Sequence, residues 1–252
     1  MKLGMPILFE YDSLIDNVKL AKELGYDFIE LNLNFNYCRN ELENIDVIEY
    51  LKESNLEFTV HFFDEFDAAS YDEVVDAYID ILRKYLESSK DLNIKLLNIH
   101  LNEGPIVTIS GNKNYLYDKE YSFYIERLIK NLNKIKELID SYGIKLVLEN
   151  VKTPKFIQKT YSDLLNQGFK FNYDIGHDYT DNNYLYSNIG LFITNIDEFH
   201  FHDSLNNKCH LAIGGGNMDL KYYKSFISKQ YVVLEVKSSD ELIKSIKKFN
   251  EI

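Results

Sequence analysis

Six short apolar segments of this chain each run into a histidine, an aspartate or a glutamate. These segment-end residues are, in chain order, His61, His100, Glu149, Asp174, His200 and Glu235. Imidazole nitrogens and carboxylate oxygens are the groups that coordinate divalent cations and transfer protons near neutral pH. Gathering several carboxylates costs free energy through repulsion and desolvation unless a cation neutralises them. If the six segments end on one face, the set predicts a divalent-metal site.

Each of these residues also has an ordinary structural explanation. A single histidine at a strand end, such as His61 or His100, is more often hydrogen-bonded in the core than bound to a metal. Glu149 could instead form an ion pair with Lys152. These separate explanations account less well for six such residues at the ends of six segments. Two glutamates, one aspartate and a histidine form a mixed oxygen and nitrogen set that suits Mn²⁺, Mg²⁺, Co²⁺ or Zn²⁺, and the sequence does not choose among them.

Further imidazoles follow two of these segments. His177 comes three residues after Asp174, and Gly176 between them permits a sharp turn. His200 and His202 share one face of their strand, because side chains alternate along a strand. The sequence therefore predicts extra nitrogen donors beside the carboxylates.

A glycine run follows another histidine. The segment H-L-A-I-G-G-G-N covers 210–217 and begins with His210. Three glycines ahead of a helix could expose backbone N–H groups to an anion or to substrate oxygens. They could equally form a flexible turn, and the sequence leaves both interpretations open.

The elements that must position these residues repeat along the chain. Apolar segments that resemble strands lie at 2–8, 27–33, 57–62, 94–100, 144–150, 169–174, 196–202 and 230–236. Helical spacing fills the intervals, as in 14–24 behind Asp12 or Ser13, or in 242–249 behind Ser239. Thr153-Pro154 predicts a helix start with proline in the first turn. Eight strands alternating with helices favour a (β/α)₈ TIM barrel, with residues 1–252 forming one domain.

Three further observations bear on this architecture. Gly25, Gly143 and Gly168 each stand just ahead of a strand, where a helix should end in a left-handed residue. An open doubly wound sheet is the competing fold, but no glycine-rich dinucleotide motif follows the first strand. The longest irregular stretch, 102–117, is expected over the barrel mouth, either as a lid or as a flexible surface loop.

Composition limits the classes of partner. The 252 residues carry a formal charge of −12, and only three are arginines. This balance argues against a broad nucleic-acid surface without excluding a local basic groove. Cys38 and Cys209 are expected to be reduced thiols. The first residues lack the apolar core and cleavage site of a signal peptide, and no apolar run reaches the length of a membrane span, so a soluble cytoplasmic protein is expected.

These residues make the chain similar to one known group, the xylose-isomerase-like superfamily of TIM barrels. The resemblance is specific at LVLEN (146–150), YDIGH (173–177), HFHDS (200–204) and H-x₃-GGGN (210–217). It implies that the metal is held by Glu149, Asp174, His200 and Glu235, which match the ligands of the sugar epimerases of the group. It also implies that His177 contacts substrate oxygens.

The same superfamily includes abasic-site endonucleases of the endonuclease IV type, which hold three zinc ions. Their additional histidines match His61, His100 and His210, and His177 would also be a ligand there. One member of the pattern is missing, because Lys208 stands where those enzymes have an aspartate. A cation at that position puts a complete three-zinc site in doubt.

The resemblance therefore implies two functions. The preferred one is a metal-dependent isomerase or epimerase of a sugar or related polyol, in which Glu149 and Glu235 move a proton through an enediolate and His177 stabilises developing charge. The alternative is a zinc-dependent abasic-site endonuclease or phosphodiesterase. A catalytically inactive binding module ranks last, because the four-residue ligand set is complete.

Overall fold

A closed barrel of eight parallel strands forms the centre of the molecule, as the sequence predicts. The computed structural model describes residues 1–252. Around the barrel the strands follow the order β1-β12-β9-β8-β7-β4-β3-β2. The barrel strands are β1 (Lys2–Pro6), β2 (Phe28–Asn32), β3 (Glu57–His61), β4 (Ile94–Leu101), β7 (Lys145–Asn150), β8 (Lys170–Asp174), β9 (Ile196–Phe201) and β12 (Tyr231–Leu234). All eight expected strands exist, and several are shorter than the apolar segments that predicted them.

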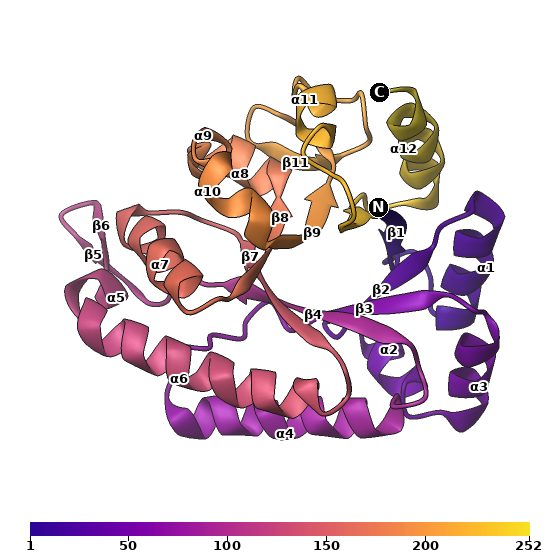
Figure 1. Cartoon of the computed structure of the whole chain (residues 1–252), viewed down its shortest axis with the longest axis horizontal. Helices are drawn as coiled ribbons and strands as arrows, with labels where there is room; N and C mark the ends of the chain where they lie inside the picture. The colour runs from indigo at the N-terminus through magenta and orange to yellow at the C-terminus, as the bar shows by residue number, and fades with distance from the viewer.

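Helices surround the barrel and cover its outer face. Figure 1 shows the two longest, α4 and α6, side by side along one flank, while α1 and α12 lie near the chain termini. The larger helices are α1 (Leu14–Leu24), α2 (Asn36–Glu41), α3 (Ile45–Glu53), α4 (Asp72–Ser88), α6 (Tyr121–Asp140), α7 (Lys155–Asn166), α8 (Ile175–Asp181) and α12 (Ser239–Glu251). Short helical turns complete the set: α5 (Leu116–Lys119), α9 (Tyr184–Ser187), α10 (Ile189–Phe192), the 3₁₀ turn Ile193–Asn195 and α11 (Leu220–Lys224). No helix combines the length and the apolar composition that crossing a membrane requires.

Local signals set most helix ends. Ser13 caps α1 by accepting a hydrogen bond from the Ile15 N–H, and Gly25 ends that helix at φ 75°. Two predicted N-caps are wrong by one residue. Ser238 rather than Ser239 caps α12, and α7 begins after Pro154 with no side-chain cap.

Apolar side chains of the strands point outward, and polar side chains point into the barrel. The polar ones lie toward the C-terminal ends of the strands. In β3, Phe58 and Val60 lie among the hydrophobic residues of the core, whereas Thr59 and His61 take the alternate positions. The same alternation buries polar residues of other strands. They include Glu30, Asn98, Glu149, Asn172, Asp174, Glu198 and His200. The barrel interior beneath the mouth is therefore polar, which is how the fold brings distant carboxylates and imidazoles together.

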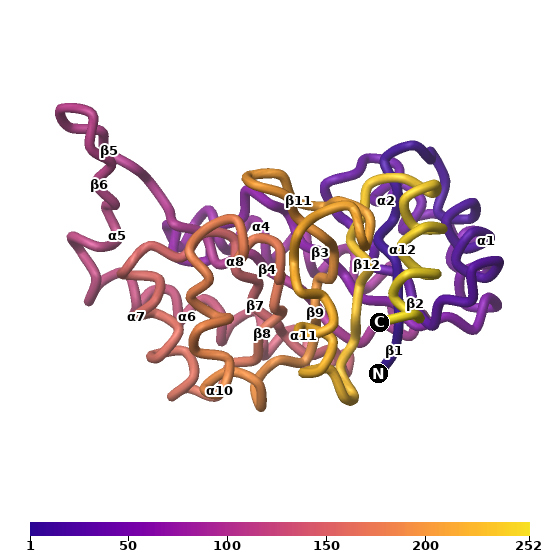
Figure 2. The backbone as a smooth tube through the Cα atoms, turned by 90° about the horizontal axis from the view of Figure 1, so that it is seen from above, coloured from indigo at the N-terminus to yellow at the C-terminus, as the bar shows by residue number.

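Residues 102–117 are not irregular, and this part of the prediction was wrong. Strands β5 (Ile106–Ile109) and β6 (Asn112–Tyr115) pair antiparallel around Ser110 and Gly111, which both have positive φ. Figure 2 shows this hairpin standing clear of the barrel, on the same side as β11 (Lys208–Leu211). The exposed side chains of Val107 and Ile109 lie on it.

Candidate metal centre

Glu149, Asp174, His200 and Glu235 meet at the mouth of the barrel. They come from β7, β8, β9 and the residue after β12, which are neighbours around the barrel. The Nδ1 atom of His200 lies 3.4 Å from Glu149 Oε1, 3.1 Å from Glu235 Oε2 and 4.0 Å from Asp174 Oδ2. One donor atom of each residue lies within 4.8 Å of every other. The structure thus brings together all four residues that the sequence proposes as ligands.

The hydrogen bonds of these four residues leave donor atoms unpaired where a cation could bind. His200 Nε2 donates to Glu30 Oε1 at 3.0 Å, so Nδ1 is the nitrogen that faces the carboxylate oxygens of the site. His200 Nδ1 and Glu235 Oε2 are buried and have no hydrogen-bond partner. The carboxylates that meet in this buried site repel one another unless a positive charge lies between them. A divalent ion at about 2.0–2.6 Å from each donor would satisfy this arrangement.

Nearby imidazoles and Lys237 lower the pKa values of the three carboxylates against the effect of burial. Burial alone would raise the pKa of Glu149, but His200 and His100 hold the pKa well below its usual range. Burial also acts upward on Glu235, where His210 and Lys237 bring the pKa well below normal. The carboxylates are therefore ionised, as metal ligands must be.

His61 and His100 form a second group with Glu149. The Nε2 of His61 lies 3.5 Å from Glu149 Oε2, and the Nε2 of His100 lies 3.6 Å from Glu149 Oε1. These three residues also have donor atoms within 4.8 Å of one another. Lys152, the alternative partner for Glu149, lies instead 4.0 Å from Asp181. Glu149 is thus shared between two imidazole-rich groups.

Two carboxamides that the sequence analysis did not single out hold Glu149 from below. Asn98 Nδ2 donates to Glu149 Oε2, and Asn172 Nδ2 donates to the same oxygen at 3.4 Å. Glu30, which orients His200, was also missed. The alternation of side chains along a strand could have identified the two asparagines. Asn98 precedes His100 by two positions and Asn172 precedes Asp174 by two, so each shares a strand face with a site residue.

His177 lies at the start of α8, close to the metal group. Asp174 caps this helix by accepting the His177 backbone N–H at 2.6 Å. The His177 Nδ1 lies 3.1 Å from the Asn150 carbonyl and 3.5 Å from Asp174 Oδ2. Since a carbonyl only accepts, Nδ1 carries the proton and Nε2 is left with a free lone pair.

Gly176 is required for a reason other than the sharp turn that the sequence suggested. Its φ is not positive, but a Cβ there would lie 1.9 Å from His202 Cε1. The His202 ring occupies that space because its Nε2 donates to Asp174 Oδ1 at 3.2 Å, while the His210 N–H donates to its Nδ1 at 2.9 Å. His202 therefore positions Asp174.

The glycine-rich loop closes on an internal carboxylate. Asp203, buried at the first position of β10 (Asp203–Leu205), accepts backbone N–H groups of Ser204, Gly214, Gly216 and Met218. The Gly214 and Gly216 N–H groups are therefore engaged within the protein, so the anion-binding interpretation fails for them. The loop is an ordered turn that keeps His210 near the mouth.

Lys208 does not enter the cluster. It is exposed at the start of β11 and forms no ion pair. Its neighbour Cys209 takes a position beside His177 and His210 instead, with donor atoms within 4.8 Å of one another. The sequence predicted Cys209 only as a reduced thiol, and its place beside two histidines was missed.

The mouth around the cluster is partly aromatic and partly acidic. A cavity of about 50 Å³ beside Glu235 is lined by Phe9, Phe35 and Lys237, and Lys237 Nζ donates to Glu235 Oε1 at 2.9 Å. Near His61 and His100, a wider hollow is lined without any hydrophobic residue. It is formed by Asp64, Glu65, Asp67, Asn102, Glu103, Gly104 and Pro105. The largest hollow lies at the opposite end of the barrel, where β7 and β8 begin.

Comparison with known families agrees with this geometry. The model of the family described as "Xylose isomerase-like TIM barrel" matches residues 18–251. Among curated relatives, the uncharacterized protein MJ1614 of Methanocaldococcus jannaschii is 26% identical over 100% of this chain and 99% of its own.

Solved structures share the fold over the whole chain. A D-tagatose 3-epimerase-like protein superposes with a TM-score of 0.77 at 23% identity, covering 100% of this chain and 96% of its own. The IOLI protein with a bound zinc atom gives a TM-score of 0.73 at 17% identity, covering 99% of this chain and 96% of its own. At these identities the likeness shows the fold alone.

Proposed function

Because the chain belongs to the xylose isomerase-like TIM barrel family, we propose that it is a metal-dependent isomerase or epimerase of a sugar or related polyol. Glu149, Asp174, His200 and Glu235 would hold the divalent ion, which is Mn²⁺, Mg²⁺, Co²⁺ or Zn²⁺. When bound, such an ion polarises a carbonyl and anchors adjacent hydroxyls. The sugar epimerases among the structural neighbours support this class of substrate.

One observation carries the proposal. Glu149 and Glu235 approach His200 Nδ1 from two sides, at 3.4 Å and 3.1 Å, so they flank the same point of the mouth. Their strands, β7 and β12, are separated around the barrel by β8 and β9. A substrate carbon between the two carboxylates would present opposite faces to them.

The two glutamates then carry the proton. One carboxylate removes the proton from the carbon beside the substrate carbonyl, and the electron pair of that C–H bond moves to form an enediolate. The second carboxylate is also ionised, so it must first take up a proton from solvent. Return of that proton to the other face inverts the centre, whereas return to the neighbouring carbon isomerises the sugar. The low pKa of Glu149 keeps it in the basic form, with burial opposed by His200 and His100.

His177 is proposed to orient the substrate. Its Nδ1–H is held by the Asn150 carbonyl, which leaves Nε2 as the nitrogen that faces other partners. Phe9 and Phe35, whose rings lie 6.2 Å apart beside the cavity at Glu235, offer an apolar wall for the carbon face of a sugar.

A phosphodiesterase remains the second candidate, and the group of His61, His100 and Glu149 favours it, because such a group could hold another metal ion. The acidic hollow beside these histidines opposes it, since it would repel a phosphate backbone. The arginines are engaged elsewhere: Arg39 binds the Leu33 carbonyl, Arg83 lies near Asp80, and Arg127 lies over the Phe123 ring.

Hydrogen exchange separates the two functions. With ketohexoses and each divalent ion in D₂O, we expect deuterium to enter the substrate at the carbon beside the carbonyl. The exchange should disappear in Glu149→Gln and Glu235→Gln. Glu57→Gln, which alters a carboxylate paired with Lys2 away from the mouth, is the matched control and should keep the exchange. Cleavage of an abasic-site duplex without any sugar exchange would overturn the proposal.

A further inference from the structure

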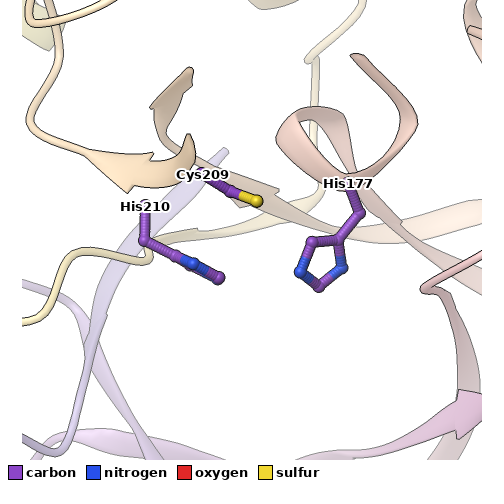
Figure 3. A group of neighbouring side chains, drawn as sticks. All are labelled: His177, Cys209 and His210. Carbon is purple, nitrogen blue, oxygen red and sulfur yellow. The ribbon is translucent and has the colours of Figure 1, made fainter. Parts of the chain in front are cut away.

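We propose that His177, Cys209 and His210 form a separate zinc site, in which the Cys209 thiolate is the decisive ligand. Figure 3 shows the two imidazoles facing each other across an open space, with the sulfur of Cys209 beside it. One donor atom from each residue lies within 4.8 Å of the other two. This site goes beyond the proposed reaction and does not depend on it, because metal binding can be measured without substrate.

A bulge in the small hairpin aims the two neighbouring residues at the same point. In the pairing of β10 (Asp203–Leu205) with β11, Asp203 faces Leu211 and Leu205 faces Lys208. Ser204 alone therefore stands opposite the pair Cys209 and His210, as in a β-bulge, which redirects side chains.

The backbone of His210 completes this arrangement. Its φ is 60°, in the left-handed region that residues with a side chain rarely adopt. In a regular strand Cys209 and His210 would point to opposite faces. The left-handed conformation breaks that alternation, so both side chains lie on the side of His177.

The third ligand is free to bind. His177 donates its Nδ1–H toward the Asn150 carbonyl at 3.1 Å, so its Nε2 retains a lone pair. The ring centroids of His177 and His210 lie 5.4 Å apart at an interplanar angle of 86°. In the hydrogen bond of 3.7 Å between Cys209 and Thr180, the Thr180 hydroxyl acts as acceptor, because it already donates to the Gly176 carbonyl.

The one carboxylate in contact with these ligands is Glu235, whose Oε2 lies 3.3 Å from His210 Nε2, and two other charged neighbours stay out of the site. Lys208 is exposed, and Asp203 is engaged by four backbone N–H groups of its own loop. The half-buried thiol of Cys209 is thus the donor that β11 supplies beside the two histidines.

The chemistry of the donors selects the metal. One thiolate and two imidazoles suit Zn²⁺ and its spectroscopic substitute Co²⁺, and they disfavour Mg²⁺ and Mn²⁺, which prefer oxygen. Three protein ligands leave one coordination position for water or another small ligand. A filled site also occupies His177 Nε2, so zinc at this site and substrate compete for that nitrogen.

Cobalt substitution tests the site directly. With Co²⁺, the wild-type protein should show a thiolate-to-cobalt charge-transfer band in the near ultraviolet. We expect Cys209→Ser to lose the band and one zinc equivalent per chain. Cys38→Ala should retain both, because Cys38 is fully buried elsewhere in the core. Glu149→Gln should also keep the band, which distinguishes this site from the four-ligand group.

A second measurement needs no mutation. In the wild-type protein treated with chelator, iodoacetamide should alkylate Cys209, and added Zn²⁺ should slow that reaction severalfold at this residue. Absence of the cobalt band, equal zinc content in the wild type and Cys209→Ser, or alkylation indifferent to Zn²⁺ would each overturn the proposal. Sugar exchange could persist in all these cases, so failure here is distinct from failure of the proposed reaction.

Discussion

Glu30 lies beneath the metal group and accepts a hydrogen bond from His200 Nε2 at 3.0 Å. Both side chains are buried, and a carboxylate can only accept, so the proton of the imidazole sits on Nε2. With Nε2 held by Glu30, Nδ1 is the nitrogen that faces Glu149 and Glu235 and that would lose its proton to bind a metal. A residue from β2 thus decides which nitrogen of a β9 histidine is available to a metal.

Removing the Glu30 carboxylate should weaken metal binding without harming the fold. We expect Glu30→Leu to lower affinity for the divalent ion by about 10–100-fold, the usual effect of losing such a supporting partner. Glu30→Gln, whose amide oxygen still accepts from His200, should lose less. Calorimetric titration with Zn²⁺ or Mn²⁺ measures the effect. Unchanged affinity in Glu30→Leu would show that Glu30 does not orient the ligand.

Metal removal should lower the melting temperature. Without a cation, the carboxylates of Glu149, Asp174 and Glu235 rely on neighbouring imidazoles and on Lys237 for compensation. At a hundredfold excess over its dissociation constant, a bound ion contributes about 2.7 kcal/mol by mass action. Scanning calorimetry with chelator and then with added metal tests this. Asp174→Asn is the control that should respond less, and a wild-type protein indifferent to both treatments would count against the metal centre.

The metal-free protein should lose stability as pH rises above neutrality. For His61, burial acts to lower the pKa, but the hydrogen bond with Glu149 raises it from 6.5 to about 10. The stability gained from that proton is complete below pH 6.5 and is lost as pH rises toward 10. Glu198 acts in the same direction, because burial and the nearby Glu30 raise its pKa from 4.5 to about 8.

The measurement is the melting temperature of chelated protein at several pH values between 6.5 and 10. It should fall across this window, and His61→Asn should flatten the part of the fall above pH 8. A melting temperature that stays level or rises through the window in the chelated wild type would contradict the expected sign.

Gly176→Ala should disturb the site through His202. The new methyl group would lie 1.9 Å from His202 Cε1, so the ring must move away from Asp174. We expect a destabilisation of about 1–3 kcal/mol, typical of overpacking, together with weaker metal binding. Gly190→Ala is the matched control, because a Cβ there meets nothing within 4 Å. Denaturant unfolding measures the stability of both variants, and equal free energies of unfolding would contradict this prediction.

The sequence alone determined the barrel and the residues at its mouth. Apolar segments alternating with helical spacing predicted eight strands in the right places, because a parallel barrel must bury each strand behind a helix. The polar residues at the strand ends identified the mouth in advance, since all parallel strands end on the same face. Glu149, Asp174, His200 and Glu235 therefore followed from strand ends and the resemblance together, although their role in binding metal remains a prediction.

Only the tertiary structure decided which groups touch. Glu30 and His200 are 170 residues apart, and no local pattern reveals that one orients the other. The role of the glycine loop depended on Asp203. Its carboxylate accepts hydrogen bonds from backbone N–H groups that, from the sequence, could have bound an anion. The position of Cys209 depended on a bulge and on a left-handed His210, and such backbone conformations arise from the pairing of β10 with β11 rather than from residue type.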